Sequence, residues 1–549
     1  MSSITGAPTG ATTDTRTSAG LFTRQSSGLV RELGVLAATG IALASVALPD
    51  TFINFNAGLT DFSKVEFYLP LFAGAFIWFV AMFAYRYLVE AIPRAGGEYV
   101  FLSRIVSPVA GSMAGIGLAV VFTYVLATNA HFFAAYTPFM LTGLGDAFSS
   151  HSISNAANHV TSEGAIAAIS VGVMLVVAAF SFFSLKRVAQ IIIAFIVLQL
   201  LAFLVLAVLL ADHSRTDFIN AFARYSNHPG AYQDVISAAK SSGVVFGASV
   251  GAMVATIPFM VVNYNGVLYS YYVGGELRRP ARTYLYASAI SIGLLVVVWV
   301  GVWALLRHTA GLHFMQAQAN LGNSSATAYG KITSLQSSAG GLGYGLALSG
   351  DPISKILLAT TIPLAAVAVN IAFLACTTRV LFALAFDRLL PVRVAQVSER
   401  NHAPTTAIVV VLIVSILFCL LLAFVNISNI VALEALFFAL ILLAGGVAAT
   451  FLAHRRPELV TRAGKKDVDR WAGLPVVTWF GATTTALALF TIIEVIAHQN
   501  AYGKFSFESV TALVVVLVAG PVIYGIARGL RRRQNALDLS MAMRELPPE

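Results

Sequence analysis

Charged residues are scarce in this chain. They make up 11% of its 549 residues, whereas hydrophobic residues make up 58%. A typical soluble domain is roughly 25% charged, so the composition favours a polytopic membrane protein over a soluble one. Cysteine is also scarce: Cys376 and Cys419 both fall inside apolar runs. Neither a disulfide framework nor a metal site is indicated, and we expect both to be small core residues.

Several motifs are missing as well. No G-x-x-x-x-G-K-[ST] sequence occurs, which argues against an ATP-driven pump. The apolar runs contain no His/Glu metal cluster and no paired acid and base, so we predict neither an enzyme nor a cofactor. The net charge is +9, but the basic residues are scattered through short loops. We therefore predict a lipid bilayer as partner and no nucleic acid.

Twelve apolar stretches approach the roughly 20 residues that a membrane-spanning helix needs. They lie at 33–56, 67–91, 108–142, 164–184, 188–211, 244–273, 283–306, 354–386, 405–425, 429–453, 473–497 and 508–529. Arg and Lys concentrate in the segments that face inward when both termini are inside. This distribution predicts a multi-pass protein of the cell membrane with both termini in the cytoplasm.

These spans divide the chain into blocks. Residues 1–28 lack the apolar core of a secretory signal, and we expect a disordered cytoplasmic tail. The remaining blocks are spans one to five over 29–211, an extracellular loop over 212–242, spans six to ten over 243–454 with an extracellular loop at 307–352, a cytoplasmic loop over 455–471, two peripheral spans over 472–530 and a cytoplasmic tail over 531–549. Each extracellular loop is either a lid or a tolerated insertion.

The sixth span is broken in its middle. Pro258 and Gly266 bracket the polar run 263–265 inside an otherwise apolar stretch. Unpaired backbone groups in lipid cost several kcal/mol each, so irregular backbone at this depth must be buried in protein or line a cavity. We interpret the break as a polar binding site. The alternative is a kinked helix whose Asn and Tyr side chains hold neighbouring helices together.

Three segments that combine glycines or charges with aromatic residues lie on the predicted cytoplasmic side. They are 93–104 (PRAGGEYVFLSR), 274–282 (GGELRRPAR) and 379–391 (RVLFALAFDRLLP). Together with 403–407 (APTTA) and the tail 537–549, their order and spacing resemble the amino acid–polyamine–organocation superfamily of secondary transporters. Prokaryotic amino acid permeases are the members that the chain resembles most directly.

The resemblance implies an all-α integral membrane protein with a LeuT-like fold. Such a fold has a core of two inverted repeats of five helices, here with two peripheral helices to make twelve. The first span then corresponds to the sixth and should also be broken. Its expected break lies at 44–49, where Pro49 removes a backbone donor.

A broken span presents helix ends of opposite partial charge, which suits a zwitterion. We expect a carboxylate to meet free N–H groups at 45–47 and an ammonium group to meet carbonyls at 259–262. Phe259 resembles, by position, the aromatic residue that gates the site in relatives. The expected substrate-binding residues are Ala44, Ser45, Val46, Ala47, Phe259, Val262, Asn263, Tyr264, Asn265, Gly266 and, from the third span, Asn129.

Three further residues are candidates for coupling to an ion. Glu434 is a carboxylate inside a core span and therefore a functional hypothesis, although a structural or outer-interface role is the alternative. His131 titrates in the physiological range, or bonds between helices. Asn370 lines the core in this interpretation. By contrast, Tyr269, Tyr271 and Tyr272 are expected in a membrane-interface belt.

We therefore predict a secondary active transporter of an amino acid or related amine, working by alternating access. A neutral or zwitterionic small-molecule substrate is preferred, because we place no acidic or basic residue at the breaks. Proton symport, exchange and facilitated diffusion all stay open, as does the oligomeric state. The alternative function is a transporter-like receptor that binds a small amine without flux.

Overall fold

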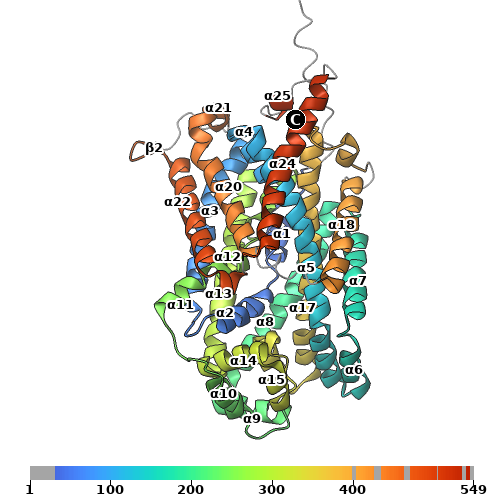
Figure 1. Cartoon of the computed structure of the whole chain (residues 1–549), viewed down its shortest axis with the longest axis vertical. Coiled ribbons are helices and arrows are strands. Elements are labelled where there is room, and N and C mark those ends of the chain that lie inside the picture. The colour runs from blue at the N-terminus through green and yellow to red at the C-terminus, as the bar shows by residue number, and fades with distance from the viewer. Residues whose placement is uncertain are drawn as a thin grey trace, which may run out of the picture.

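The structure is a bundle of long apolar helices (Figure 1). It is a computed structural model, and it describes residues 31–398, 403–425, 434–462, 470–503, 505–533 and 539–543. Within these residues ten helices are long and apolar enough to cross a membrane. They are α3 (Tyr68–Ala91), α5 (Pro108–Phe148), α7 (Glu163–Ser181), α8 (Leu185–Asp212), α13 (Pro280–Thr309), α17 (Pro352–Phe386), α18 (Thr405–Phe424), α20 (Glu434–Arg455), α22 (Val476–Ala497) and α24 (Phe507–Arg533).

These ten helices coincide with ten of the predicted spans, and the prediction of a helical multi-pass membrane protein is confirmed. The third span is longer than predicted, because α5 continues to Phe148. The predicted tail at 1–28 and most of the 537–549 motif lie outside the described residues. Both cysteines are buried and free, as expected.

The first and sixth predicted spans are both interrupted. The first consists of α1 (Val35–Ala44) and α2 (Asp50–Asp61), and the sixth of α11 (Val250–Ala255), α12 (Ile257–Asn263) and the 3₁₀ helix η2 (Tyr269–Tyr272). Left-handed backbone marks each break, with φ at +53° for Ala47 and +80° for Gly266. The two predicted breaks are confirmed, whereas the count of twelve spans and the inverted repeat stay predictions.

Polar side chains and prolines set where the long helices begin. The Ser107 hydroxyl accepts a hydrogen bond from the backbone of Ala110 at the start of α5. The Asp351 carboxylate does the same for Ser354 at the start of α17. Both helices carry proline as their first residue, where its missing N–H is not needed. Proline and a cap together explain why the chain turns at these two positions.

One end of the bundle carries a cap of short helices (Figure 1). The cap consists of α9 (Arg215–Tyr225), α10 (Ala231–Ser241), α14 (Leu312–Ser324), α15 (Ala326–Ile332) and α16 (Gly341–Leu348). Its centre is aromatic: Tyr232 stacks on Phe314 with 4.5 Å between ring centroids, and Phe218 lies 5.1 Å from Tyr344. The two segments predicted as long outer loops are therefore largely helical.

Side chains of α14 bind the cap to the outer end of α2. Asn320 donates to the carbonyl of Leu59 over 2.7 Å, and Gln316 donates to that of Val65 over 3.0 Å. Arg307 and Glu66 form an ion pair beside them. The outer half of the first span is thus held by the cap through several independent bonds.

The other elements are short. They are α4 (Glu98–Ile105), α6 (His151–Ala156), α21 (Pro457–Arg462), α23 (Gln499–Tyr502), α25 (Leu539–Ala542), the 3₁₀ helices η1 (Ala157–His159), η3 (Gly274–Glu276), η4 (Ser337–Ala339) and η5 (Val392–Ala395), and an antiparallel pair of strands, β1 (Arg470–Trp471) and β2 (Leu474–Pro475). Of these, α4 and η3 lie in the predicted cytoplasmic motifs and bear on function.

The peripheral helix α24 packs on α5 through a glycine. A Cβ atom at Gly520 would lie 2.1 Å from the carbonyl oxygen of Ser112, whereas one at Gly525 on the same helix would meet nothing within 4 Å. Small residues let helices approach closely in a membrane. We expect Gly520→Val to lower the free energy of unfolding by about 1–3 kcal/mol through overpacking.

The thermal unfolding midpoint of the purified protein in detergent measures this effect. Gly525→Val is the matched control and should leave the midpoint within error of the parent. Equal midpoints for the two variants would show that α24 does not pack on α5 in this way.

Candidate functional site

The two helix breaks touch each other. A Cβ atom at Gly266 would lie 2.6 Å from both the carbonyl carbon and the carbonyl oxygen of Ser45. Because Gly266 also has a positive φ, only glycine fits this position without strain. The contact brings two predicted site residues together that are far apart in the sequence. It places irregular backbone from both spans inside the protein, as the sequence predicted.

Asn263 joins the end of α12 to the first turns of α2. Its side-chain amide donates to the Thr51 hydroxyl over 3.1 Å, and its oxygen accepts from Asn54 over 2.9 Å. Asn265 donates to the carbonyl of Val262 over 2.8 Å, while its Oδ1 is buried with no hydrogen-bond partner in the described part of the chain. Asn263 therefore joins the two breaks by hydrogen bonds, and the Asn265 Oδ1 atom is an acceptor that a solute can use.

The other residues predicted in the sixth span point in different directions. The ring of Tyr264 packs edge-on against Trp299 at 4.6 Å, and its buried hydroxyl has no partner among the described residues. Phe259 lies against Tyr502, with 4.5 Å between centroids. Phe259 and Val262 both pack on the start of α20 and on α22, so they do not face the α1–α2 break directly.

The N–H groups expected to be free in the first break are not free. Ser45 donates to Ile41 over 3.0 Å, Val46 to Leu43 over 3.2 Å and Ala47 to Ala44 over 3.1 Å. The last turn of α1 tightens here, which satisfies these donors locally. The expectation of free N–H groups at 45–47 is therefore wrong in this conformation, although all these residues are buried at the break.

Asp50 is a residue that the sequence reasoning missed. It is the first residue of α2, directly after the break, and lies one turn from Asn54 on the same helix face. It is half-buried, as is Glu434, the first residue of α20. The signal was present, because a carboxylate that follows Pro49 within an apolar run is costly enough to suggest a function.

The coupling candidates are spread over three helices. Glu434 is half-buried at the start of α20. His131 and Asn129 are half-buried on α5, two positions apart and thus on different sides of the helix. Asn370 is fully buried in α17, and neither of its amide atoms has a partner among the described residues.

Gln199 of α8 was also missed and resembles Asn370 in its surroundings. It is fully buried, and both amide atoms lack a partner within the described ranges. Below it Ile193 meets Gly40 of α1, and above it Phe203 stacks on Phe52 of α2 at 5.4 Å. Gln199 therefore lies level with the α1–α2 break. Within the residues that the structure describes, no group of three His, Cys, Asp or Glu could hold a metal ion.

At the end of the bundle opposite the cap, tyrosines surround a buried carboxylate. Tyr85 and Tyr272 each donate to Glu98 over 2.7 Å, and Tyr271 also donates to it. Burial raises the pKa of the Glu98 carboxyl, and the three hydroxyl donors oppose that rise. Tyr269, Tyr271 and Tyr272 are all fully buried, so their predicted role in a membrane-interface belt is wrong.

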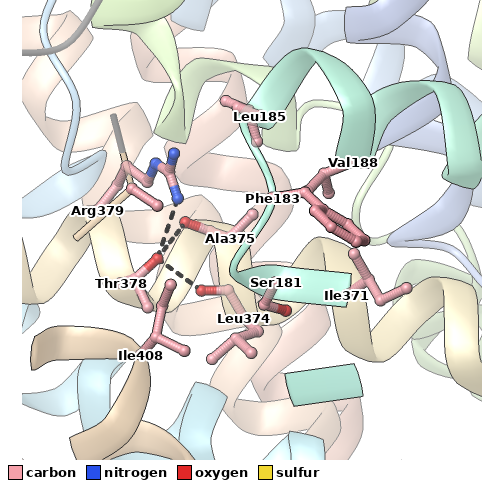
Figure 2. Close-up of a pocket in the computed structure, with 11 residues that line it drawn as sticks. Ser181, Phe183, Leu185, Val188, Ile371, Leu374, Ala375, Thr378, Arg379 and Ile408 are labelled. Carbon is pink, nitrogen blue, oxygen red and sulfur yellow. Dashed lines mark hydrogen bonds between the residues drawn. The ribbon is translucent and has the colours of Figure 1, made fainter. Parts of the chain in front are cut away.

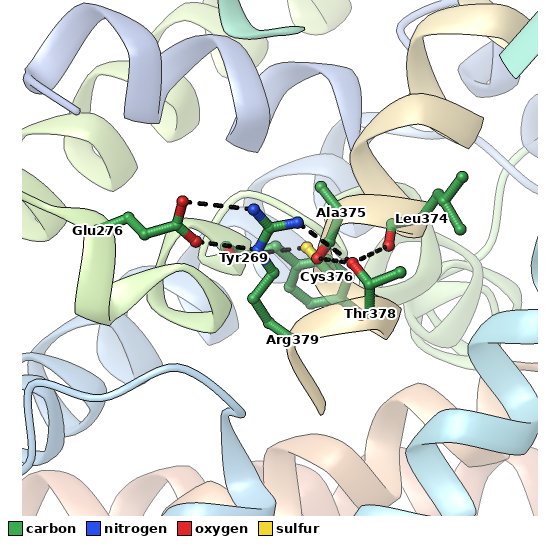
Figure 3. A network of polar contacts seen from close by, with 7 residues as sticks. All are labelled: Tyr269, Glu276, Leu374, Ala375, Cys376, Thr378 and Arg379. Atoms are coloured by element: carbon green, nitrogen blue, oxygen red, sulfur yellow. Dashed lines mark hydrogen bonds and ion pairs between the residues drawn. The ribbon is translucent and has the colours of Figure 1, made fainter. Parts of the chain in front are cut away.

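Two buried ion pairs lie beside this carboxylate. Arg379 binds Glu276 over 2.9 and 3.3 Å and also donates to Thr378 (Figure 3). Arg104 binds Asp387 over 2.6 Å, and the Tyr99 hydroxyl donates to the same carboxylate oxygen over 2.7 Å. The three motifs predicted on the cytoplasmic side thus meet Tyr85 of α3 and two tyrosines of η2 in one buried polar layer. We call this layer the seal: Tyr85, Glu98, Tyr99, Arg104, Tyr271, Tyr272, Glu276, Arg379 and Asp387.

Backbone contacts close the seal further. Gly96 donates to the carbonyl of Tyr272 over 3.2 Å, and Leu33 donates to that of Glu276 over 3.0 Å. A Cβ atom at Gly97, where φ is +57°, would lie 2.2 Å from the Tyr272 ring. These contacts join the loop before α4, the start of the first span and the segment after η2. The bundle is closed at this end.

A small cavity lies next to the seal (Figure 2). It is lined by Ser181, Phe183, Leu185, Val188, Ile371, Leu374, Ala375, Thr378, Arg379, Ala403 and Ile408, and its volume of about 10 Å³ has room for about one water molecule. The Arg379 guanidinium beside it is already engaged by Glu276. The cavity is therefore too small and too apolar to be the main binding site.

The Arg379–Glu276 pair provides a test of the seal. Removing one partner of a buried ion pair costs about 3–5 kcal/mol, because the other charge is left buried alone. We expect Arg379→Gln to lower the thermal unfolding midpoint strongly. The double variant Arg379→Gln/Glu276→Gln should regain part of the loss, since it leaves no charge behind. A double variant less stable than both single variants would contradict the pairing.

Comparison with known proteins agrees with this arrangement. No curated protein matches the chain, but the family model described as Amino acid permease matches residues 57–536. The match includes the sixth-span break and all three motifs of the seal. It confirms the resemblance to the amino acid–polyamine–organocation superfamily, and the nearly all-helical bundle agrees with the LeuT-like fold of that family. The chain belongs to the amino acid permease family.

Proposed function

We propose that this amino acid transporter is a secondary active one, which moves an amino acid or related amine across the cell membrane by alternating access. The observation that carries the proposal is the contact between the two helix breaks at Ser45 and Gly266. Polar atoms without partners in the described residues lie on Asn265 at the sixth-span break, on Gln199 level with the α1–α2 break, and on Asn370 of α17. Buried polar groups of this kind are costly unless a solute or water binds them.

The two ends of the bundle offer the two gates that alternating access needs. With the orientation that the basic residues predict, the cap faces outward and the seal faces the cytoplasm. Outward opening requires α2 to separate from α14, and inward opening requires Tyr271 and Tyr272 to leave Glu98. The first span contacts both gates, through the carbonyl of Leu59 at one end and the backbone of Leu33 at the other.

The breaks also supply electrostatic complementarity to a solute. The last carbonyls of α12 carry partial negative charge and the first N–H groups of α2 carry partial positive charge. Of the coupling candidates Glu434, His131 and Asn370, Glu434 is best supported, because it is a half-buried carboxylate at the start of α20 and a carboxylate at membrane depth is costly enough to suggest a function. A carboxylate there binds either a proton or a cationic group, which is compatible with proton coupling and with exchange.

Uptake into proteoliposomes tests transport itself. We expect saturable uptake of at least one radiolabelled amino acid or amine, and acceleration of its flux when unlabelled substrate is present on the opposite side. Empty liposomes are the control. Binding measured by thermal shift without any flux would favour the receptor alternative and contradict the proposal.

Gly266→Leu tests where the site lies. The new side chain would collide with the Ser45 carbonyl and would hold an unfavourable positive φ, so we expect uptake to fall to background. Gly293→Leu in α13 is the matched control, since a Cβ atom there would meet nothing within 4 Å. Both variants should insert into the membrane normally. Uptake by Gly266→Leu at the parent rate would refute the placement of the site.

A further inference from the structure

Three aromatic rings from distant parts of the chain meet beside the sixth-span break. Phe62 follows α2, Phe259 lies in α12, and Tyr502 ends α23, the short helix between the two peripheral spans. The ring centroids of Phe259 and Tyr502 are 4.5 Å apart, and the Phe62 centroid lies 6.4 Å from the first and 6.1 Å from the second. All three distances are typical of favourable aromatic pairs. The first span, the sixth span and the peripheral spans thus share one aromatic cluster.

The Tyr502 hydroxyl also bonds to the kink between α11 and α12. In a regular helix the Phe259 N–H would bond to the carbonyl of Ala255, four residues back. Here that N–H bonds to the carbonyl of Thr256 over 3.1 Å, so the Ala255 carbonyl loses its helical partner. Tyr502 donates to this carbonyl over 2.6 Å. A peripheral side chain therefore satisfies a backbone group that the interruption of the sixth span leaves free.

These contacts belong to a small apolar cluster that is separate from the main core. Its buried members come from α20, α22 and α23, and they are Ala435, Leu436, Val495 and Tyr502. Phe62, Phe259 and Val262 are partly buried, and each packs against both this cluster and the main core. Movement of either broken span therefore changes its packing against the peripheral helices.

The interacting groups of Tyr502 are used within the protein. The residue is 4% exposed, its hydroxyl bonds to Ala255, and its ring packs on Phe259. The end of α22 adds a further contact, because the His498 ring lies 5.5 Å from that of Phe62. Tyr502 is thus a positioning residue, which fixes where Phe259 and the α11–α12 kink lie.

We propose that the peripheral spans take part in transport, through an aromatic latch in which Tyr502 holds the sixth span in the closed position of the outer gate. The latch consists of Phe62, Phe259 and Tyr502. Opening of the outer gate then requires Phe62 and Phe259 to leave Tyr502, which releases both broken spans from the peripheral spans. The inference rests on the proposed transport function and adds a positioning residue to it.

Labelling of a thiol at the break tests the latch. Thr51→Cys places a cysteine in the first turn of α2, at a residue that is fully buried and accepts a hydrogen bond from Asn263. A membrane-impermeant methanethiosulfonate reagent applied to intact cells reaches this thiol only through the outer gate, so we expect slow labelling. The protein without Thr51→Cys is the blank, because Cys376 and Cys419 are both buried.

Two further substitutions, each combined with Thr51→Cys, separate the ring of Tyr502 from its hydroxyl. Tyr502→Ala should speed labelling by roughly tenfold or more, because it removes the hydrogen bond and the aromatic contacts together. Tyr502→Phe should speed it by about two- to tenfold, because it removes the hydrogen bond alone. In inside-out vesicles the reagent meets the seal, and neither variant should label faster than Thr51→Cys alone.

Tyr524→Ala provides the control for these rates. It makes the same truncation in the other peripheral helix, α24, at a residue that is 5% exposed. The Tyr524 ring forms no aromatic pair with Phe62 or Phe259 within the residues that the structure describes. Labelling of Thr51→Cys should therefore be unchanged by Tyr524→Ala. Elution as a single species in size-exclusion chromatography shows that each variant is folded.

The outcomes separate this inference from the proposed function. Equal labelling rates with and without Tyr502→Ala overturn the latch, and so does equal acceleration from both faces of the membrane or by Tyr524→Ala. If Tyr502→Ala does not fold, an unchanged rate in Tyr502→Phe overturns it. Labelling needs no substrate, so these results do not depend on flux. Absence of flux for amino acids and amines in the parent protein overturns the transport function itself.

Discussion

The structure depends on how backbone polar groups are satisfied at membrane depth. A continuous helix bonds its own N–H and C=O groups, but the first and sixth spans give this up at 45–49 and 264–268. The tightened end of α1 satisfies its own N–H donors by local hydrogen bonds. The Gly266 backbone packs on the Ser45 carbonyl, so each break is covered by the other. Each break is tolerated because protein, not lipid, surrounds it. The bundle around them is what makes two interrupted spans stable.

In the seal, charged side chains are buried, and other side chains satisfy them. Nine polar residues from four segments are buried together, and nearly every charge in the layer meets an opposite charge or hydroxyl donors. Buried ion pairs contribute little net stability over apolar packing, but removing only one partner is costly, because the other charge is left buried alone. A layer of this kind separates as a whole or not at all, which is the behaviour expected of a gate with two discrete states.

Local features of the sequence predicted much of this architecture. Hydrophobic length located the ten long helices, and proline with glycine located the sixth-span break, because each signal is contained within one segment. The first-span break was expected from the family resemblance, with Pro49 as its local mark. The partners of those segments were not predictable in the same way. Glu98 meets Tyr271 and Tyr272 across 173 and 174 positions of the chain. The hydrogen bond from Tyr85 to the carbonyl of Ile441 spans 356 positions, and a single sequence carries no record of it.

The cap was missed for a different reason. Its helices are short and set in a background of Ser, Gly and Asn, so no long apolar run marks them in the sequence. The cap holds α2 chiefly by its main chain, since Gln316 and Asn320 donate to carbonyls and not to side chains of residues 59–65. These two bonds therefore depend on the backbone path of residues 59–65, while the buried side chains of Leu59 and Val65 pack in the core. A substitution in this stretch that keeps the backbone path and the apolar packing is compatible with an unchanged contact to the cap.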